Sequence, residues 1–142
     1  MHKFKENYKP TYGDMSTALG AESSPAADTI ETDTYVDMRY YDALVVYGIA
    51  SGVASDAVLT LTIQEATATD GSASATTTQT DTFTSTHVTD TDVMQAEIRG
   101  EQLSSGYRYA GAIIASDDNS CTGIVTMLML QGRARYGQAT LP

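Results

Sequence analysis

The sequence is poor in cysteine, tryptophan and long apolar runs. Cys121 is the only cysteine among 142 residues, which excludes an internal disulfide and a cysteine-based zinc cluster. Such sparse cysteine is typical of a protein made in a reducing cytoplasm. Tryptophan, the side chain that sugar-stacking platforms favour, is absent. No apolar run approaches the ~20 residues of a membrane span, and none follows the basic N-terminal residues as in a secretory signal.

Basic residues are also scarce, and they gather at the two ends of the chain. All three lysines lie in the first nine residues, and two of the five arginines lie in the last ten. Between them, residues 28–132 hold three arginines and fifteen acidic residues, a net charge of 3 − 15 = −12. An acidic body repels nucleic acid and anionic membranes, so we expect neither as a partner. Basic segments at both ends favour a subunit that attaches to a larger surface.

Catalytic chemistry is nearly absent from the sequence. His2 and His87 have no metal-binding spacing, and no nucleophile elbow or phosphate-binding glycine loop occurs. Cys121 opens an apolar stretch, which is typical of a small buried hydrophobe. The carboxylate candidates Asp90-x-Asp92 and Asp117-Asp118-Asn119 lie in turn-like stretches, where such side chains cap backbone, although a loop calcium site is an alternative. We therefore expect a non-enzymatic protein without cofactor or metal.

What the chain has in abundance is threonine and tyrosine, both of which favour β-strands. Residues 57–65 alternate most clearly, with Leu59, Leu61 and Ile63 on one face and polar side chains on the other. Asp70-Gly71 predicts a turn in the small-residue loop that follows. The predicted strands are Thr34–Met38, Ala43–Ala50, Ala57–Glu65, Gln79–Ser85, Val93–Arg99, Tyr107–Ala115 and Thr122–Gln131.

Seven short strands without a convincing helix predict an all-β fold, an antiparallel β-sandwich or jelly roll. The last two strands flank a turn at residues 116–120 and are predicted to form a hairpin in the centre of a sheet. The domain boundaries follow from the composition. We predict an extended N-terminal arm at 1–27, the β-sandwich domain at 28–132 and a C-terminal arm at 133–142.

Both arms carry residues suited to binding a partner. In the N-terminal arm aromatic residues alternate with lysines, whereas purely solvating tails are poor in aromatics. In the C-terminal arm, alternate residues of an extended chain point the same way, so Arg133 and Arg135 form a plausible clamp on a partner's carboxylates. Neutralisation of the domain's own acidic body is the alternative. The predicted partner-binding residues are Lys3, Lys5, Tyr8, Lys9, Tyr12, Arg133, Arg135 and Tyr136.

Sugar binding is a rival interpretation, because β-sandwiches often bind carbohydrate. Tyr40-Tyr41, which lies between two predicted strands, is the most suggestive pair for a stacking platform. The alternative is that the tyrosine rings fill core edges or a subunit interface with their hydroxyls outward.

The chain resembles small virion proteins of tailed bacteriophages, in particular capsid decoration (cement) proteins. Three stretches carry the resemblance. The first, Asp28-Thr-Ile-Glu-Thr-Asp-Thr-Tyr-Val-Asp-Met-Arg-Tyr-Tyr-Asp-Ala-Leu-Val-Val-Tyr, leads from a short strand into an apolar one. The second is AVLTLTIQEA at Ala57–Ala66, followed by a small-residue loop, and the third is the ending Leu128-Met-Leu-Gln-Gly-Arg-Ala-Arg-Tyr.

The resemblance implies a subunit on the capsid exterior that binds the major capsid protein, forms a homotrimer and stabilises the shell. The protein would be made in the host cytoplasm and end in the virion. Arms that become ordered on docking would extend the contact beyond the globular footprint. A tail-tube, head–tail joining or fibre-base subunit, or a carbohydrate-binding module, are the alternatives.

Overall fold

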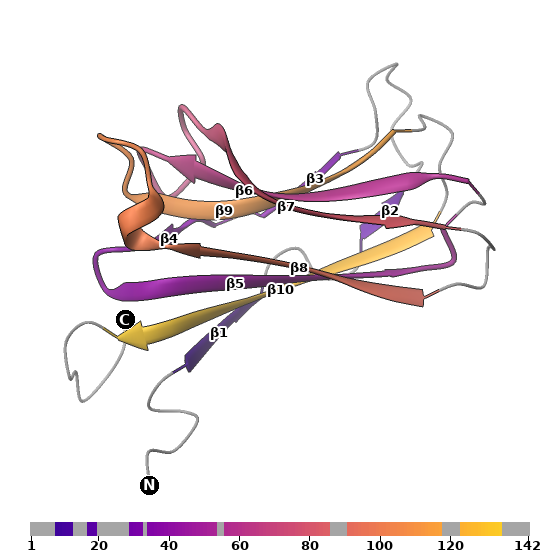
Figure 1. The fold of residues 1–142 in the computed structure, drawn as a ribbon, viewed down its shortest axis with the longest axis horizontal. Helices are drawn as coiled ribbons and strands as arrows, with labels where there is room; N and C mark the ends of the chain where they lie inside the picture. Colours follow the sequence, from indigo (N-terminus) through magenta and orange to yellow (C-terminus); the bar gives the residue numbers. More distant parts are fainter. Residues whose placement is uncertain are drawn as a thin grey trace, which may run out of the picture.

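The computed structural model describes residues 8–12, 17–19, 29–32, 34–53, 56–85, 91–117 and 123–134. They form two antiparallel β-sheets that pack face to face (Figure 1). The prediction of an antiparallel β-sandwich or jelly roll is confirmed. The regular helical structure in these ranges is one 3-10 turn, η1 (Gly100–Gln102). None of the described segments contains a helix long and apolar enough to cross a membrane.

Each sheet has five strands. Sheet A has the order β1-β10-β5-β8, with β2 also paired to β10. Its strands are β1 (Tyr8–Tyr12), β2 (Thr17–Leu19), β5 (Tyr41–Ser51), β8 (Thr91–Arg99) and β10 (Gly123–Ala134). Sheet B has the order β3-β9-β6-β7, with β4 also paired to β9. Its strands are β3 (Thr29–Glu31), β4 (Val36–Asp37), β6 (Val58–Ala66), β7 (Ala75–Thr84) and β9 (Tyr109–Ser116).

All seven predicted strands overlap observed ones, β4 to β10. The alternation in β6 is confirmed: Leu59, Leu61 and Ile63 are fully buried, and they face the core between the sheets. The predicted turn is also present, because Gly71 adopts φ +76° in the loop between β6 and β7. That conformation strains residues with a Cβ and suits glycine.

The predicted hairpin of the last two strands is wrong. β9 belongs to sheet B and β10 to sheet A, so the connection between them crosses the sandwich. Their central position is confirmed, since β9 lies between β6 and β3/β4, and β10 lies between β5 and β1/β2. Near-continuous apolar character marks a strand with partners on both sides, but it does not identify those partners.

The predicted N-terminal arm is partly wrong, because two of its segments are strands of sheet A. Tyr8 pairs with Gly132 and Tyr12 with Leu128, so β1 covers an edge of β10 that would otherwise leave backbone groups unpaired. Pro10 is tolerated there because β1 is an edge strand. At the other end, β10 continues to Ala134, two residues into the predicted C-terminal arm.

Side chains from the inner faces of both sheets form the core, as expected for a sandwich. The largest of them include Leu44, Met94 and Ile98 from sheet A and Leu61 and Ile114 from sheet B, each at most 1% exposed. On one side of the sandwich, β7 and β8 meet across the two sheets. There the Gln95 backbone N–H donates to Oδ2 of Asp81 at 2.8 Å, so an edge amide of β8 has a partner.

A second buried layer lies on the outer face of sheet B and is centred on Tyr35, which is 2% exposed. The Tyr35 hydroxyl lies 2.6 Å from Oε1 of Glu31 and 2.7 Å from Oε1 of Gln64, and its backbone N–H donates to Thr69 O at 2.9 Å. The β6–β7 loop is thereby fixed against the sheet. Burial first, and then the hydrogen bond and charge of Glu31, raise the pKa of Tyr35 above its ordinary value.

Candidate interaction surfaces

A strip of apolar side chains lies on the outer face of sheet A, the face turned away from sheet B. In β5, buried Leu44 and Val46 alternate with outward side chains, among them Ile49. The register sets Ile49 directly opposite Val93, and these two side chains are 38% and 52% exposed, while Ile124 is 50% exposed. The apolar strip consists of Val45, Tyr47, Ile49, Val93, Ile124, Leu128 and Leu130.

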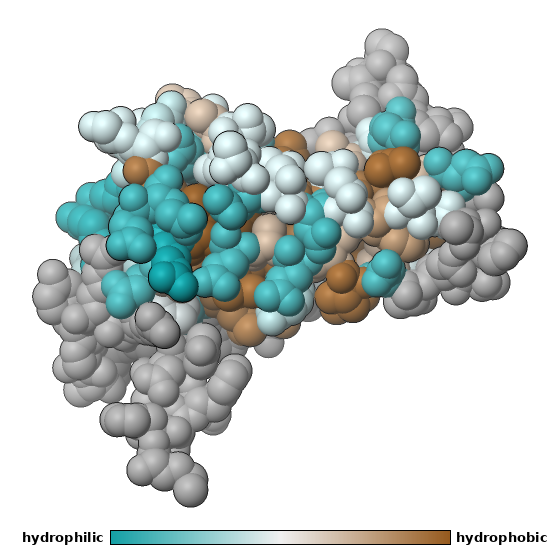
Figure 2. All heavy atoms as spheres, in the orientation of Figure 1, coloured by the Kyte–Doolittle hydropathy of each residue, from teal (hydrophilic) through white to brown (hydrophobic). Residues whose placement is uncertain are grey.

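The apolar strip exists because β5 and β10 are apolar on both faces, whereas only one face contributes to the core. The outer face of sheet B is different, since threonines pair across it, Thr60 with Thr82 and Thr62 with Thr80. Figure 2 shows brown, hydrophobic surface over β5 and β8 among teal, hydrophilic side chains. A contiguous apolar patch on a sheet face marks a site where another surface packs.

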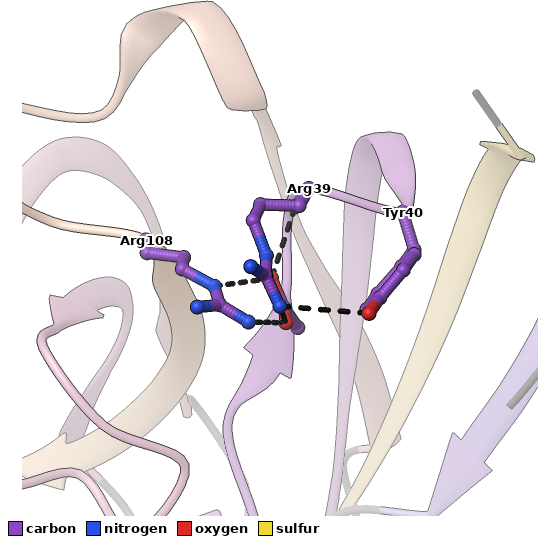
Figure 3. A network of polar contacts seen from close by, with 4 residues as sticks. Arg39, Tyr40 and Arg108 are labelled. Atoms are coloured by element: carbon purple, nitrogen blue, oxygen red, sulfur yellow. Dashed lines mark hydrogen bonds and ion pairs between the residues drawn. The ribbon is translucent and has the colours of Figure 1, made fainter. Parts of the chain in front are cut away.

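A polar cluster lies at one end of the sandwich, around the carboxylate of Asp37 at the end of β4 (Figure 3). Arg108, just before β9, donates from Nε to Oδ1 at 2.8 Å and from a terminal nitrogen to Oδ2. Arg39, in the turn before β5, donates from Nη2 to Oδ2 at 3.1 Å and from its backbone N–H to Oδ1 at 3.1 Å. The Met38 backbone N–H donates to Arg108 O at 3.0 Å and so holds the two segments together.

In this cluster two guanidiniums share the carboxylate of Asp37. The hydrogen bond that Arg108 donates to Asp37 is the main cause that raises the pKa of Arg108 above its ordinary value, so the guanidinium stays charged. Each guanidinium also lies over a tyrosine ring, Arg39 at 5.3 Å from the centroid of Tyr40 and Arg108 at 4.9 Å from that of Tyr109. The side chain of Arg39 remains 55% exposed.

Arg99 joins this end of the sandwich, since it closes β8 opposite Ala43 at the start of β5. Its Nε lies 3.7 Å from Oε1 of Glu97. We call Arg39, Arg99 and Arg108 together the arginine end. The backbones of Lys9 and Arg133 lie at the same end, in β1 and β10. Every basic residue in the described segments is therefore at the arginine end.

The opposite end of the sandwich is acidic. Asp56, Asp92 and Asp117 are exposed there, and none of the described residues at this end is a lysine or arginine. Asp117 also fixes the start of β6, because its Oδ1 accepts the Val58 N–H at 2.7 Å while its own N–H donates to Val58 O at 3.1 Å. We call these three residues the acidic end. The described basic residues are thus confined to one end of the sandwich, whereas described carboxylates lie at both ends, and the arginine end also holds Asp42, Glu97 and Glu101.

The structure describes half of the predicted partner-binding residues, and only their backbones. Tyr8, Lys9 and Tyr12 lie in β1, and Arg133 lies in β10, all paired into sheet A. The remaining predicted residues, which lie outside the described segments, are Lys3, Lys5, Arg135 and Tyr136. The pairing of β1 with β10 brings the basic parts of both predicted arms together, although they are more than a hundred residues apart in the sequence.

The cluster around Asp37 was not predicted from the sequence. Arg39 and Arg108 are two of three arginines in an acidic body, and their common partner, Asp37, is 71 residues from Arg108. The available signal was the scarcity of arginine. With only three arginines among fifteen acidic residues, each arginine could have been expected to pair with a carboxylate. Local spacing offers a further hint in Asp37-x-Arg39, where the aspartate accepts the backbone N–H two residues later.

The structure does not form the tyrosine platform of the sugar-binding rival. Tyr41 is buried at 3% exposure, and its hydroxyl has no hydrogen-bond partner in the part of the chain that the structure describes. Tyr40 is half-buried beneath Arg39. The two rings therefore do not present one surface.

The predicted carboxylate turns are described in part. Asp92 lies in β8 and accepts the Val93 N–H at 2.7 Å, and Asp117 accepts the N–H of Val58, 59 residues away, at 2.7 Å, so neither of these bonds is the capping of a turn's own backbone that was predicted. Asp90, Asp118, Asn119, Cys121 and both histidines lie outside the described residues. Within those residues no group of three or more metal-binding side chains occurs.

Comparison with known proteins identifies the fold and no family. No family of known proteins matches the chain in sequence, and no curated protein does so. A structure of infectious bursal disease virus Gx strain is similar at TM-score 0.53 and 10% identity, over 95% of this chain and 34% of that one. The CBM22-1–GH10 modules of Clostridium thermocellum xylanase 10B, complexed with xylohexaose, are similar at TM-score 0.52 and 9% identity, over 92% of this chain and 27% of that one.

This chain therefore spans about a third or less of the length of these two chains. At such low identity the likeness extends to the fold alone. The protein belongs to the same broad class of β-sandwich architecture as a viral protein and a xylanase module, and its function has to be argued from its own surfaces.

Proposed function

We propose that the chain is a non-enzymatic structural subunit of a virion, and more specifically a capsid decoration protein of a tailed bacteriophage. In this role it binds the major capsid protein on the capsid exterior, as a trimer, and stabilises the shell. The observation that carries the proposal is the apolar strip. A sandwich whose outer sheet face exposes Ile49, Val93 and Ile124 is suited to packing beside another protein surface.

The energetics of the apolar strip fit a repeated contact. Covering the exposed half of each of these three side chains contributes on the order of 1 kcal/mol per side chain. A single such contact is weak. Around a symmetric shell, however, linked subunits raise the effective concentration of one another, and the many weak contacts together give firm attachment.

The predicted arms have a place in this proposal. Segments 1–7 and 135–142 continue from β1 and β10 at the arginine end, so they would extend the contact on that side of the subunit. Lys3, Lys5, Lys9, Tyr8 and Tyr12 would anchor the first arm, and Arg133, Arg135 and Tyr136 the second. Because β1 and β2 belong to sheet A, a truncation that tests the arms removes only residues 1–7 and leaves the sheet intact.

The jelly-roll fold supports a capsid role, since the similar structures include one of a virus. A tail-tube, head–tail joining or fibre-base subunit uses the same kind of surface, and large rings or tubes in solution would favour it. A carbohydrate-binding module has a similar fold in the xylanase, but this chain lacks a tyrosine platform at positions 40 and 41.

The test uses virus particles produced without this protein. Purified wild-type protein is mixed with the particles, sedimented through a gradient and quantified against the major capsid protein. We expect attachment at a fixed ratio, loss of attachment for Val93→Asp, and undiminished attachment for the matched control Thr80→Asp on the outer face of sheet B. Failure of the wild-type protein to attach, or equal attachment of Val93→Asp, would refute the proposal.

A further inference from the structure

One carboxylate joins the edges of the two sheets on the side where β7 and β8 meet. Asp81, in β7, accepts the backbone N–H of Thr82 on Oδ1 at 2.9 Å and that of Gln95, in β8, on Oδ2 at 2.8 Å. We infer that Asp81 is an autoinhibitory latch, which keeps the edge of β8 from pairing with β8 of a second copy of this chain. The inference goes beyond the proposed capsid role and does not depend on it, since it concerns the purified protein.

β7 and β8 are edge strands, because each is paired with a single neighbour in the described part of the chain, β6 and β5 respectively. Backbone N–H groups along an antiparallel strand alternate between its two sides. The Gln95 N–H bonds a side chain of the other sheet and not β5, so the N–H groups of Val93, Glu97 and Arg99 also point to the open edge. Such a row of backbone groups is a template on which another strand can pair.

Side-chain oxygens cap the N–H groups at both ends of this edge. The Val93 N–H donates to Oδ1 of Asp92 at 2.7 Å, and the Arg99 N–H donates to Oε1 of Gln102 at 2.8 Å. Both caps are local, since one acceptor lies in β8 itself and the other in η1, directly after it. The middle of β8, from Gln95 to Glu97, is therefore where a further strand would pair.

Asp81 guards the middle of this edge from the other sheet. It lies opposite Leu61, whose side chain is fully buried, so the Asp81 carboxylate is on the inner face of β7 and reaches across the sandwich to Gln95. An inward-pointing charge on an edge strand is one of the devices by which proteins prevent edge-to-edge pairing. Loss of this carboxylate would free the N–H groups of Thr82 and Gln95 together.

The edge of β8 is complementary to itself. When two copies of β8 pair antiparallel and centred on Gln95, Gln95 faces Gln95 and Val93 faces Glu97, so no like charges lie opposite each other. These are the hydrogen-bonded pairs of the ladder, because the backbone groups of the odd-numbered residues point to the edge. The contact is isologous, so it closes as a two-fold dimer.

Disulfide cross-linking in a Cys121→Ser background tests the inference. In the centred register, the Cα atoms of position 95 in the two copies lie about 5.5 Å apart, within the range that a disulfide spans. Those of position 93 are offset by four residues, roughly 14 Å along the strand, and cannot be bridged. Gln95→Cys and Val93→Cys are each prepared with Asp81 intact and with Asp81→Ala, and dimer formation under a mild oxidant is followed over time. Glu101→Ala, at an exposed position of η1, removes the same charge and is the control for Asp81→Ala.

We expect Asp81→Ala to speed dimer formation of Gln95→Cys at least about tenfold, because pairing raises the effective concentration of the facing thiols. Val93→Cys should remain slow in both backgrounds, and Glu101→Ala should leave the rate of Gln95→Cys unchanged. Asp81→Asn, which keeps one acceptor oxygen, should give an intermediate rate, and it replaces Asp81→Ala if that variant does not fold. Equal rates at position 95 with and without the Asp81 carboxylate would overturn the inference. Equal acceleration at positions 93 and 95 would also overturn it, because the association would then not use the edge of β8.

Discussion

The ring of Tyr35 occupies the space that a side chain at position 111 would fill. A Cβ added to Gly111 would lie 2.8 Å from Cδ1 and from Cε1 of Tyr35, and 2.7 Å from Oγ1 of Thr32. On the other side of the ring, a Cβ at Gly71 would lie 2.8 Å from Cε2. Two glycines on separate segments therefore leave room for one buried tyrosine, which fixes the β6–β7 loop on the outer face of sheet B.

Gly111→Ala should destabilise the protein by about 1–3 kcal/mol, because the new methyl group meets a rigid ring and a buried threonine. Gly48→Ala is the matched comparison in β5. There the new Cβ lies 2.7 Å from Cδ1 of Ile114 and 3.2 Å from Cε of Met94, the far ends of flexible side chains. Urea denaturation should give the larger loss for Gly111→Ala, and the reverse order would contradict this assignment of Tyr35.

Tyr35→Phe should cost about 1–3 kcal/mol near neutral pH, since it leaves the buried Gln64 side chain without its hydroxyl partner. The effect should appear as a lower midpoint in urea denaturation with an unchanged slope. Thr82→Ala, an exposed position on β7, should stay within about 0.5 kcal/mol of wild type. An equally stable Tyr35→Phe would show that the hydroxyl contacts contribute nothing.

The pH dependence of stability gives a second test of Tyr35. Its pKa is raised in the folded protein, so above about pH 10 the unfolded chain loses the phenolic proton while the folded chain keeps it. Stability should therefore be intact below pH 10 and fall as the pH rises further. Burial also raises the pKa of Tyr41, in the same direction. The measurement is thus the difference between wild type and Tyr35→Phe, which should shrink between pH 9 and pH 11.

Tyr41→Phe should behave in the opposite way to Tyr35→Phe. Its hydroxyl is buried, and no partner for it occurs in the described segments, so removing it relieves an unsatisfied polar group. We expect thermal denaturation to show unchanged or higher stability, by up to about 1 kcal/mol. A clear loss would mean that the hydroxyl has a partner in the folded protein.

Much of this fold could be predicted from the sequence, because side-chain alternation is a local signal. The face of β8 with Met94, Ala96 and Ile98 and the face of β6 with Leu61 follow directly from period two. The pairing of β9 with β6 instead of β10 could not be predicted, since both strands are apolar and a short loop joins them. Strands β1 to β3 were not predicted, because these short strands form by pairing with β9 or β10 and have no clear side-chain alternation of their own.

The interaction surfaces were less predictable than the fold. The sequence shows that basic residues gather near both ends of the chain. It does not show that folding brings basic residues from both parts to one end of the sandwich. The register of β1 on β10 and the turn after β4 bring Lys9, Arg133 and the three arginines of the body to one end. Asp37 and Arg108 meet only because β4 pairs with β9, a long-range contact that no local spacing encodes.

Asp37→Asn should lower the melting temperature, because it leaves two guanidiniums close together without their shared carboxylate. Glu97→Gln removes an exposed carboxylate 3.7 Å from Arg99 at the same end, and it should change stability by about 0.5 kcal/mol or less. Each variant removes one negative charge, so their melting temperatures from differential scanning calorimetry can be compared directly. Equal melting temperatures would show that the Asp37 cluster does not hold β4 and β9 together.

The central claim, that the apolar strip is the surface by which this subunit attaches to a particle, can be tested by thiol labelling. In a Cys121→Ser background, Val93→Cys and Thr80→Cys place one thiol on the outer face of sheet A or of sheet B. Both should react with a maleimide in the free protein. On virus particles, the thiol at position 93 should become protected while that at position 80 still reacts. Equal labelling of position 93 in the free and attached protein would contradict the account.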